Sequence, residues 1–160
     1  MTDAKAPLVA FDIDVLKIVL RDRETTSAGE RDPEAAAAAE ILSRAAAVVI
    51  TPVVVHDLNE SGEPSRVSDA DRRFVIVGQD DDYFHGCAKA RAERYIEMHP
   101  DPRDCRAIAE AECADADIFV TLNHEVVAGL ADRTEKISIA KPGEALIRLS
   151  RSSASHEETR

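Results

Sequence analysis

The stretch DCRAIAEAECADADIFVTLN, residues 104–123, decides the fold class. It opens on an acid, continues as an alanine-rich helix that Asp101 is placed to cap, and ends in the short strand DIFVT. Because a helix that runs directly into a buried strand is part of a βαβ unit, this stretch predicts a parallel sheet with right-handed crossovers.

The same alternation of strands and helices extends in both directions. Strands are predicted at 7–13, 47–51, 73–79, 117–121 and 136–140, with helices at 33–46, 51–61, 80–98, 102–115 and 123–132 and a polar loop at 61–72. We expect a three-layer α/β/α fold with a mainly parallel five-stranded sheet. It would form a single domain over residues 1–150, followed by a disordered polar tail at 151–160.

Composition narrows the class of protein. Three cysteines without CxxC spacing argue against a disulfide framework or a zinc knuckle, and free thiols favour a cytoplasmic location. No apolar run approaches the roughly 20 residues of a membrane span, so no membrane association is expected. The net charge of −11 opposes nucleic-acid binding unless carboxylates gather around a metal ion or a basic partner masks the surface. The absence of Trp argues against a base-stacking platform.

Four side chains with oxygen donors fall at ends of the predicted elements. They are Asp12 after the first strand, Asp57 in TPVVVHDLNES, Asp104 at the start of a helix, and Asn123 after DIFVT. Since sites in parallel sheets lie beyond the carboxyl ends of the strands, we expect these side chains to converge there. Carboxylates are the ligands that Mg²⁺ prefers, and such an ion can clamp a phosphodiester and activate a water.

Several nearby residues are expected to support that site. Asp14 is placed for capping or indirect support, Thr121 can offer its hydroxyl to the same pocket, and Asp117 can orient neighbours from below. Capping is the alternative role for Asp12 and Asp104, and stabilisation of a turn is the alternative for Asn123. The remaining acids, at 80–82 and at 110, 112 and 115, are expected to lie on solvated faces.

Together these motifs resemble a PIN domain, the fold of VapC-type toxin ribonucleases. The resemblance covers residues 7–140 and rests on LVAFDIDVL, TPVVVHDLNES and the 104–123 block, in that order. It implies an endoribonuclease dependent on Mg²⁺ or Mn²⁺, with Asp12, Asp57 and Asp104 in the metal pocket and the Asn123 position contributing. It also implies an RNA substrate, a small antitoxin partner and a homodimer.

Two other functions are left open. Asp57 stands where the family has Glu and Asn123 where it has an acid, which fits a catalytically weakened or inactive PIN-like binding module. Alternatively, FDIDVL together with VIVGQDDD suggests a phosphatase similar to the haloacid dehalogenases. Val15 and Leu16 follow the paired acids here, whereas that family requires Gly-Thr, so this alternative is the weaker one.

Overall fold

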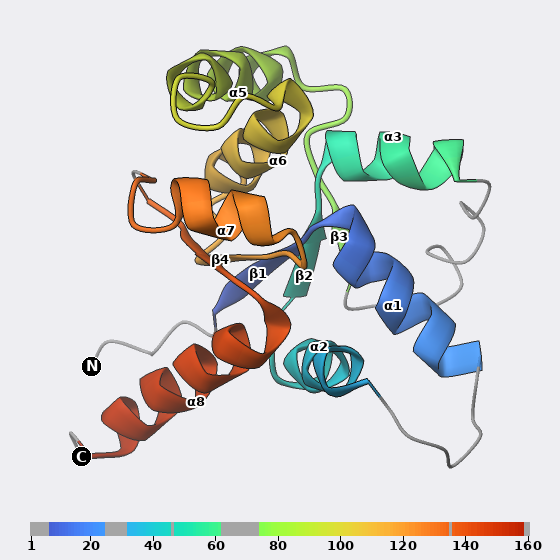
Figure 1. Ribbon diagram of the computed structural model, residues 1–160, viewed down its shortest axis with the longest axis vertical. Helices are drawn as coiled ribbons and strands as arrows, with labels where there is room; N and C mark the ends of the chain where they lie inside the picture. The colour runs from blue at the N-terminus through green and yellow to red at the C-terminus, as the bar shows by residue number, and fades with distance from the viewer. Residues whose placement is uncertain (1–6, 25–31, 46, 62–73, 135, 159–160) are drawn as a thin grey trace.

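A five-stranded parallel sheet lies at the centre of the protein, in the order β3-β2-β1-β4-β5 (Figure 1). The computed structural model describes residues 7–24, 32–45, 47–61, 74–134 and 136–158. The strands are β1 (Leu8–Phe11), β2 (Ala47–Ile50), β3 (Phe74–Ile76), β4 (Ile118–Val120) and β5 (Ser138–Ala140). The parallel sheet predicted from the sequence is therefore confirmed.

Helices connect successive strands and cover both faces of the sheet. Within the described residues they are α1 (Ile13–Glu24), α2 (Pro33–Arg44), α3 (Pro52–Glu60), α5 (Asp82–Tyr95), α6 (Pro102–Cys113), α7 (His124–Leu130) and α8 (Pro142–Glu158). Proline at the first helical position begins α2, α3 and α6, where its missing N–H costs no hydrogen bond. The Asp101 side chain caps α6 as predicted, by accepting from the N–H groups of Arg103 and Asp104.

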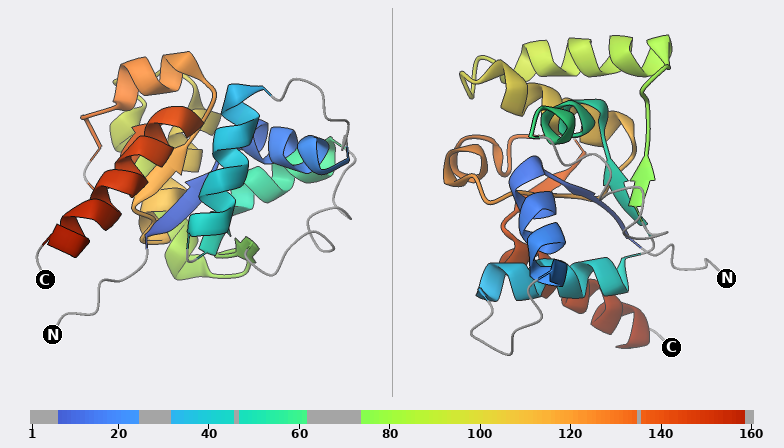
Figure 2. Two further views of the ribbon diagram at one scale, coloured as in Figure 1. Left: turned by 90° about the horizontal axis from the view of Figure 1, so that it is seen from below. Right: turned by 90° about the vertical axis from the view of Figure 1, so that its right-hand side faces the viewer.

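Alternate residues of each strand enter two separate cores, as the two-residue period of a strand requires. Val9 and Phe11 of β1 pack with α1, α2 and α8 on one face, whereas Ala10 packs with α6 and α7 on the other. Figure 1 shows the layers directly, with α2 and α8 below the sheet and α5, α6 and α7 above it, and Figure 2 shows the same layers from two other sides. The three-layer α/β/α architecture predicted from the sequence is confirmed.

The register of the sheet brings the carboxyl ends of its central strands together. The Asp12 N–H donates to the Val120 carbonyl at 2.9 Å, so the residue after β1 lies beside the end of β4. The Thr121 N–H donates in turn to the Ala140 carbonyl of β5 at 3.1 Å. Residues that are far apart in the sequence therefore meet at this edge because every strand points the same way.

The C-terminal segment and the loop after α3 were both predicted to lack regular structure. Residues 151–158 belong to α8, so the prediction of disorder there is wrong. The packed first turns nucleate the helix, and no Gly or Pro after Gly143 interrupts its propagation. Apart from Ser61, the predicted polar loop at 61–72 lies outside the described residues. In the part of the chain that the structure describes, no helix is both long and apolar enough to cross a membrane.

The prediction that the acids of α6 lie on solvated faces is wrong for two of them. Glu110 is 2% exposed and Glu112 is 1% exposed. Glu112 accepts from the Tyr95 hydroxyl and, at 2.9 Å, from the Lys136 N–H. Glu110 accepts at 2.9 Å from the Val53 N–H of α3 and at 2.9 Å from Arg106 Nε. A buried carboxylate is tolerated when hydrogen bonds replace its water, and Glu110 thereby joins α6 to the start of α3.

This junction predicts a measurable loss of stability. Glu110→Ala leaves the Val53 N–H and Arg106 without their buried acceptor, and we expect it to lower the free energy of unfolding by about 2 kcal/mol. Urea denaturation followed by circular dichroism measures the change. The same substitution at the exposed Glu93 of α5 is the control, and equal losses in the two variants would contradict the role of Glu110.

Candidate functional site

Three carboxylates from separate segments converge on the guanidinium group of Arg103. Nη1 of Arg103 lies 2.9 Å from Asp12 Oδ1 and 3.3 Å from Asp104 Oδ1. Nε donates to Asp57 Oδ2 at 2.6 Å, and Nη2 forms an ion pair with the same oxygen. The convergence of Asp12, Asp57 and Asp104 was expected from the sequence, whereas the cation at its centre was not.

Asp12 is the most enclosed of these acids, with 2% of the residue exposed. Its position directly after β1 places its carboxylate over the edge of the sheet. Oδ2 accepts from the Thr121 hydroxyl at 2.8 Å, and Oδ1 accepts from the Ile13 N–H at 2.8 Å and from Arg103. Thr121 is itself 0% exposed and its oxygen accepts from the Asn123 N–H at 3.1 Å. These fixed donors hold the Asp12 carboxylate in one orientation.

Asp104 lies in the first turn of α6, where the positive end of the helix dipole favours an acid. Since Asp101 caps the helix, the Asp104 side chain is left to face the pocket. Its Oδ2 lies 2.9 Å from Nε2 of His99, which is 5% exposed, and 3.4 Å from Nδ2 of Asn123. A carboxylate only accepts, so both neighbours act as donors and restrain Asp104.

Asn123 is placed beside the pocket but its amide oxygen is engaged elsewhere. Oδ1 caps α7 by accepting from the N–H groups of Glu125 and Val126 at 3.0 and 3.4 Å. The amide NH₂ group is therefore the end that faces Asp104. Asn123 therefore caps α7 and contacts Asp104 through its NH₂ group, while the amide oxygen that would bind a metal is already engaged.

The other predicted supporting residues differ in their distance from the pocket. Asp14 lies behind Asp12, where burial and then the Asp12 charge raise the pKa of its carboxyl above the usual value. Asp117 lies at the opposite edge of the sheet, before β4, where its carboxylate accepts from the Leu8 N–H at 2.8 Å. Its contact therefore ties β4 to the start of β1 and does not reach the pocket.

The donor set suits a hard cation, and a cation already stands in the middle of it. Burial alone would lower the pKa of Arg103, but the Asp12 and Asp57 carboxylates raise it above its ordinary value, so the guanidinium is charged. Three carboxylates face this single positive charge. In the described residues no three His, Cys, Asp or Glu side chains are placed to hold a metal ion. Carboxylate oxygens are ligands of the type that Mg²⁺ prefers, but in the structure they surround the guanidinium of Arg103.

Sequence reasoning missed Arg103, His99 and Glu110. The signal for Arg103 was its position immediately before Asp104 in PRDC, and the signal for His99 was the short HPDP segment that leads into α6. Neither residue type carries a pattern that reveals an ion pair with distant segments.

Cys105, next in the chain, is 1% exposed, and burial raises the pKa of its thiol to about 11. At neutral pH it is therefore a thiol and not a thiolate ligand.

The acids required by the phosphatase alternative lie elsewhere. Asp80, Asp81 and Asp82 follow β3, which β2 separates from β1, and all three are exposed. Asp81 caps α5 by accepting from the Phe84 N–H at 3.1 Å. These positions do not support a shared phosphate site with Asp12.

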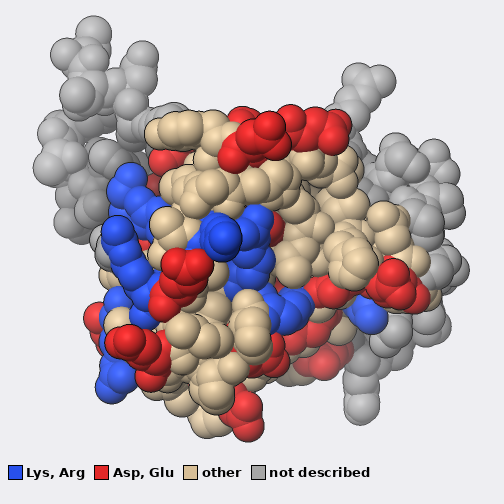
Figure 3. All heavy atoms as spheres, turned by 90° about the horizontal axis from the view of Figure 1, so that it is seen from above, with Lys and Arg blue, Asp and Glu red and all other residues tan. Residues whose placement is uncertain are grey.

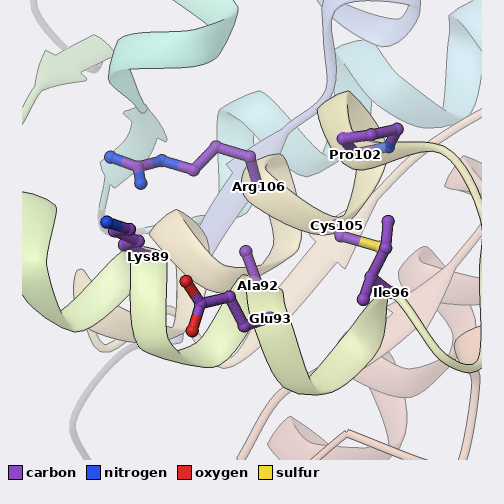
Figure 4. A pocket seen from close by; sticks show the side chains of 7 residues that line it. All are labelled: Lys89, Ala92, Glu93, Ile96, Pro102, Cys105 and Arg106. Atoms are coloured by element: carbon purple, nitrogen blue, oxygen red, sulfur yellow. The ribbon is translucent and has the colours of Figure 1, made fainter.

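A hollow with a volume of about 270 Å³ lies between α5 and α6. Figure 4 shows the side chains that line it, which are Lys89, Ala92, Glu93, Ile96, Pro102, Cys105 and Arg106. Its wall is largely apolar, with charged groups from Lys89, Glu93 and Arg106 at one end. None of the three converging carboxylates lines it, so it is distinct from the acidic pocket.

Comparison with known proteins finds solved structures with a similar fold. The sequence matches no protein-family model and no curated protein. Among solved structures, a chain in a toxin–antitoxin complex from Klebsiella pneumoniae has a TM-score of 0.56 at 16% identity, covering 84% of this chain and 97% of that one. A chain of the VapBC2 complex from Rickettsia felis, solved with a DNA fragment from the VapBC2 promoter, has a TM-score of 0.54 at 12% identity. This match covers 84% of this chain and 98% of that one. These likenesses are consistent with the VapC-type PIN-like fold that the sequence motifs resemble, and at such low identity they show the fold alone.

The hydroxyl of Thr121 offers a test of how the pocket is held. Thr121→Val removes the donor to the buried Asp12 carboxylate, and we expect it to lower the free energy of unfolding by about 2 kcal/mol. Thr51 provides a matched control, because its hydroxyl is also buried but has no hydrogen-bond partner among the described residues. Thr51→Val should cause no loss, since it removes an unpaired polar atom. Urea titration compares the two variants, and similar losses would contradict the assigned role of Thr121.

Proposed function

We propose that this protein is an endoribonuclease of the PIN-domain type that depends on Mg²⁺ or Mn²⁺. The observation that carries the proposal is the convergence of Asp12, Asp57 and Asp104 on one cation at the carboxyl edge of the sheet. Buried carboxylates without a cation would repel one another, so a pocket of this kind is built for positive charge. These three residues would hold the ion. The bound ion would supply a water of lowered pKa and stabilise charge on the phosphodiester.

The chain's own residues fix the pocket before any ion arrives. Thr121 orients Asp12, while His99 and Asn123 orient Asp104. Asp57 enters from α3, whose first turn is tied to α6 through Glu110. Carboxylates that are already oriented lose little freedom when they bind a ligand, which favours both affinity and geometry.

An RNA substrate needs positive charge on a protein whose net charge is −11. Figure 3 shows that Lys and Arg side chains gather on the face over α5 and α6, among acidic side chains. Lys89 and Arg94 are exposed on α5, and α6 supplies the pocket with Arg103 and Asp104. In this proposal the phosphate backbone approaches over that basic region to reach the carboxylates.

A protein partner is part of the same proposal. The solved structures of similar fold are toxin–antitoxin complexes, and this chain would be the toxin neutralised by a small antitoxin. Among the described residues, large apolar side chains are exposed at Val75, Ile76, Tyr83, Ile96, Met98 and Ile147. Such side chains suit contact with an antitoxin or with a second copy of the chain in a homodimer.

The enzyme is tested by cleavage of a labelled RNA, with DNA of the same sequence in parallel. We expect EDTA to abolish RNA cleavage and Mg²⁺ or Mn²⁺ to restore it, because the bound ion would activate the attacking water. Asp12→Asn should reduce the rate by at least about 100-fold, since it removes a ligand charge while keeping the shape of the side chain.

The matched control is Asp132→Asn, at an exposed residue beyond the far end of α7. Its φ of 68° is one that asparagine also adopts, so this variant should keep its fold and its activity. Cleavage that survives EDTA, or that is equal in the wild type and Asp12→Asn, would rule out the proposed enzyme.

A non-catalytic module of the same fold is the second candidate. The observation that favours it is that the guanidinium of Arg103 pairs with all three carboxylates. Such a module should show no saturable binding of Mn²⁺ in calorimetry, whereas the nuclease should.

A further inference from the structure

We infer that Arg103 is a built-in cation that occupies the carboxylate pocket and must turn outward before a divalent ion binds. The inference rests on the proposed function and concerns the regulation of the same site. It makes Arg103 a gating residue whose exchange with the metal sets the apparent metal affinity.

The first argument is that the guanidinium and a metal ion need the same space. Nη1 of Arg103 lies 2.9 Å from Asp12 Oδ1 and 3.3 Å from Asp104 Oδ1, which places it between the two oxygens. A Mg²⁺ ion bound to carboxylate oxygens lies roughly 2.1 Å from each of them. An ion that contacts both oxygens from the side on which Nη1 lies would overlap Nη1, and the two positive charges would also repel each other.

The second argument is that Arg103 is more exposed than the acids with which it pairs, and that its side-chain hydrogen bonds to them are all made by the guanidinium group. Its side chain is 29% exposed, against 4% for Asp12 and 8% for Asp104. Nη2 makes no hydrogen bond of its own among the described residues, although it lies against Asp57. A long side chain at the rim can turn into solvent without moving the core.

The third argument concerns the backbone to which Arg103 is attached. Arg103 lies in the first turn of α6, and its N–H donates to the Asp101 cap at 2.9 Å. The helix dipole disfavours a cation at that end, so the acids must supply the attraction that keeps the guanidinium there. Once a divalent ion neutralises the carboxylates, most of their electrostatic attraction for the guanidinium is lost.

The fourth argument is charge balance. Removal of the guanidinium alone would leave Asp12, Asp57 and Asp104 facing one another in a partly buried pocket, which is unfavourable. Exchange of one cation for another avoids that state. Thr121 and His99 contact Asp12 and Asp104 independently of Arg103, so the carboxylates keep their orientation during the exchange.

The test is calorimetric titration of the full-length protein with MnCl₂ alone, without RNA. In Arg103→Gln the pocket loses its internal competitor, and we expect Mn²⁺ to bind at least about tenfold more tightly, the factor expected if Arg103 occupies the pocket in about 90% of molecules. The metal-free variant should also unfold at a lower temperature than the wild type, and added Mn²⁺ should raise its Tm by more. Arg103→Lys, which keeps one charge but cannot bridge three carboxylates, should bind Mn²⁺ with intermediate affinity.

Two further variants control the measurement. Arg106→Gln changes an arginine one turn along α6 that pairs with Glu110, so it perturbs the same helix without opening the pocket. Its Mn²⁺ affinity should equal that of the wild type. The double variant Asp12→Asn, Arg103→Gln should lose the gain, which assigns the binding to this pocket.

The outcomes separate the inference from the function on which it rests. Equal or weaker Mn²⁺ binding in Arg103→Gln, with binding retained in the wild type, would overturn the role of Arg103 and leave a metal-dependent enzyme standing. Absence of binding in both proteins would overturn both and favour the non-catalytic module. If Arg103→Gln does not fold, Arg103→Lys carries the comparison in the same direction, and unchanged affinity in that folded variant would overturn the inference.

Discussion

Three carboxylates around one guanidinium form the interaction on which the arrangement of this protein depends. Each acid comes from a different element: Asp12 from the end of β1, Asp57 from α3 and Asp104 from α6. Acids that are withdrawn from water repel one another unless a cation or hydrogen-bond donors compensate them. Arg103 supplies the cation and couples the three elements at the carboxyl edge of the sheet.

The surrounding fold makes this arrangement possible at little cost. Parallel strands carry their carboxyl ends to one edge, so the residues that follow β1 and β4 meet there without any special turn. The helices α3 and α6 then approach from either side, and the buried Glu110 fixes their contact through the Val53 N–H. The same edge collects the donors Thr121, His99 and Asn123. The pocket is therefore a consequence of topology, with a small number of polar side chains setting its geometry.

Acidic side chains have two different structural roles in this chain. Glu110 and Glu112 are buried and structural, since each accepts hydrogen bonds that hold neighbouring elements together. Asp12, Asp57 and Asp104 are gathered around a cation, and their charge is compensated locally. A net charge of −11 therefore does not describe every part of the surface, since Lys and Arg side chains gather among acidic ones on the face shown in Figure 3.

The sequence by itself determined the order of elements, the parallel sheet and the convergence of the three acids. The first two follow from hydrophobic periodicity and helix caps, and the third from the rule that sites lie beyond the carboxyl ends of parallel strands, together with the resemblance to PIN domains. The tertiary structure alone decided that Glu110 and Glu112 are buried, that Asp117 lies at the far edge, and that Arg103 fills the carboxylate pocket. The physical reason is that the environment of a charged side chain depends on groups from distant segments. Arg103 and Asp12 are 91 positions apart, and only the folded chain brings their opposite charges to 2.9 Å.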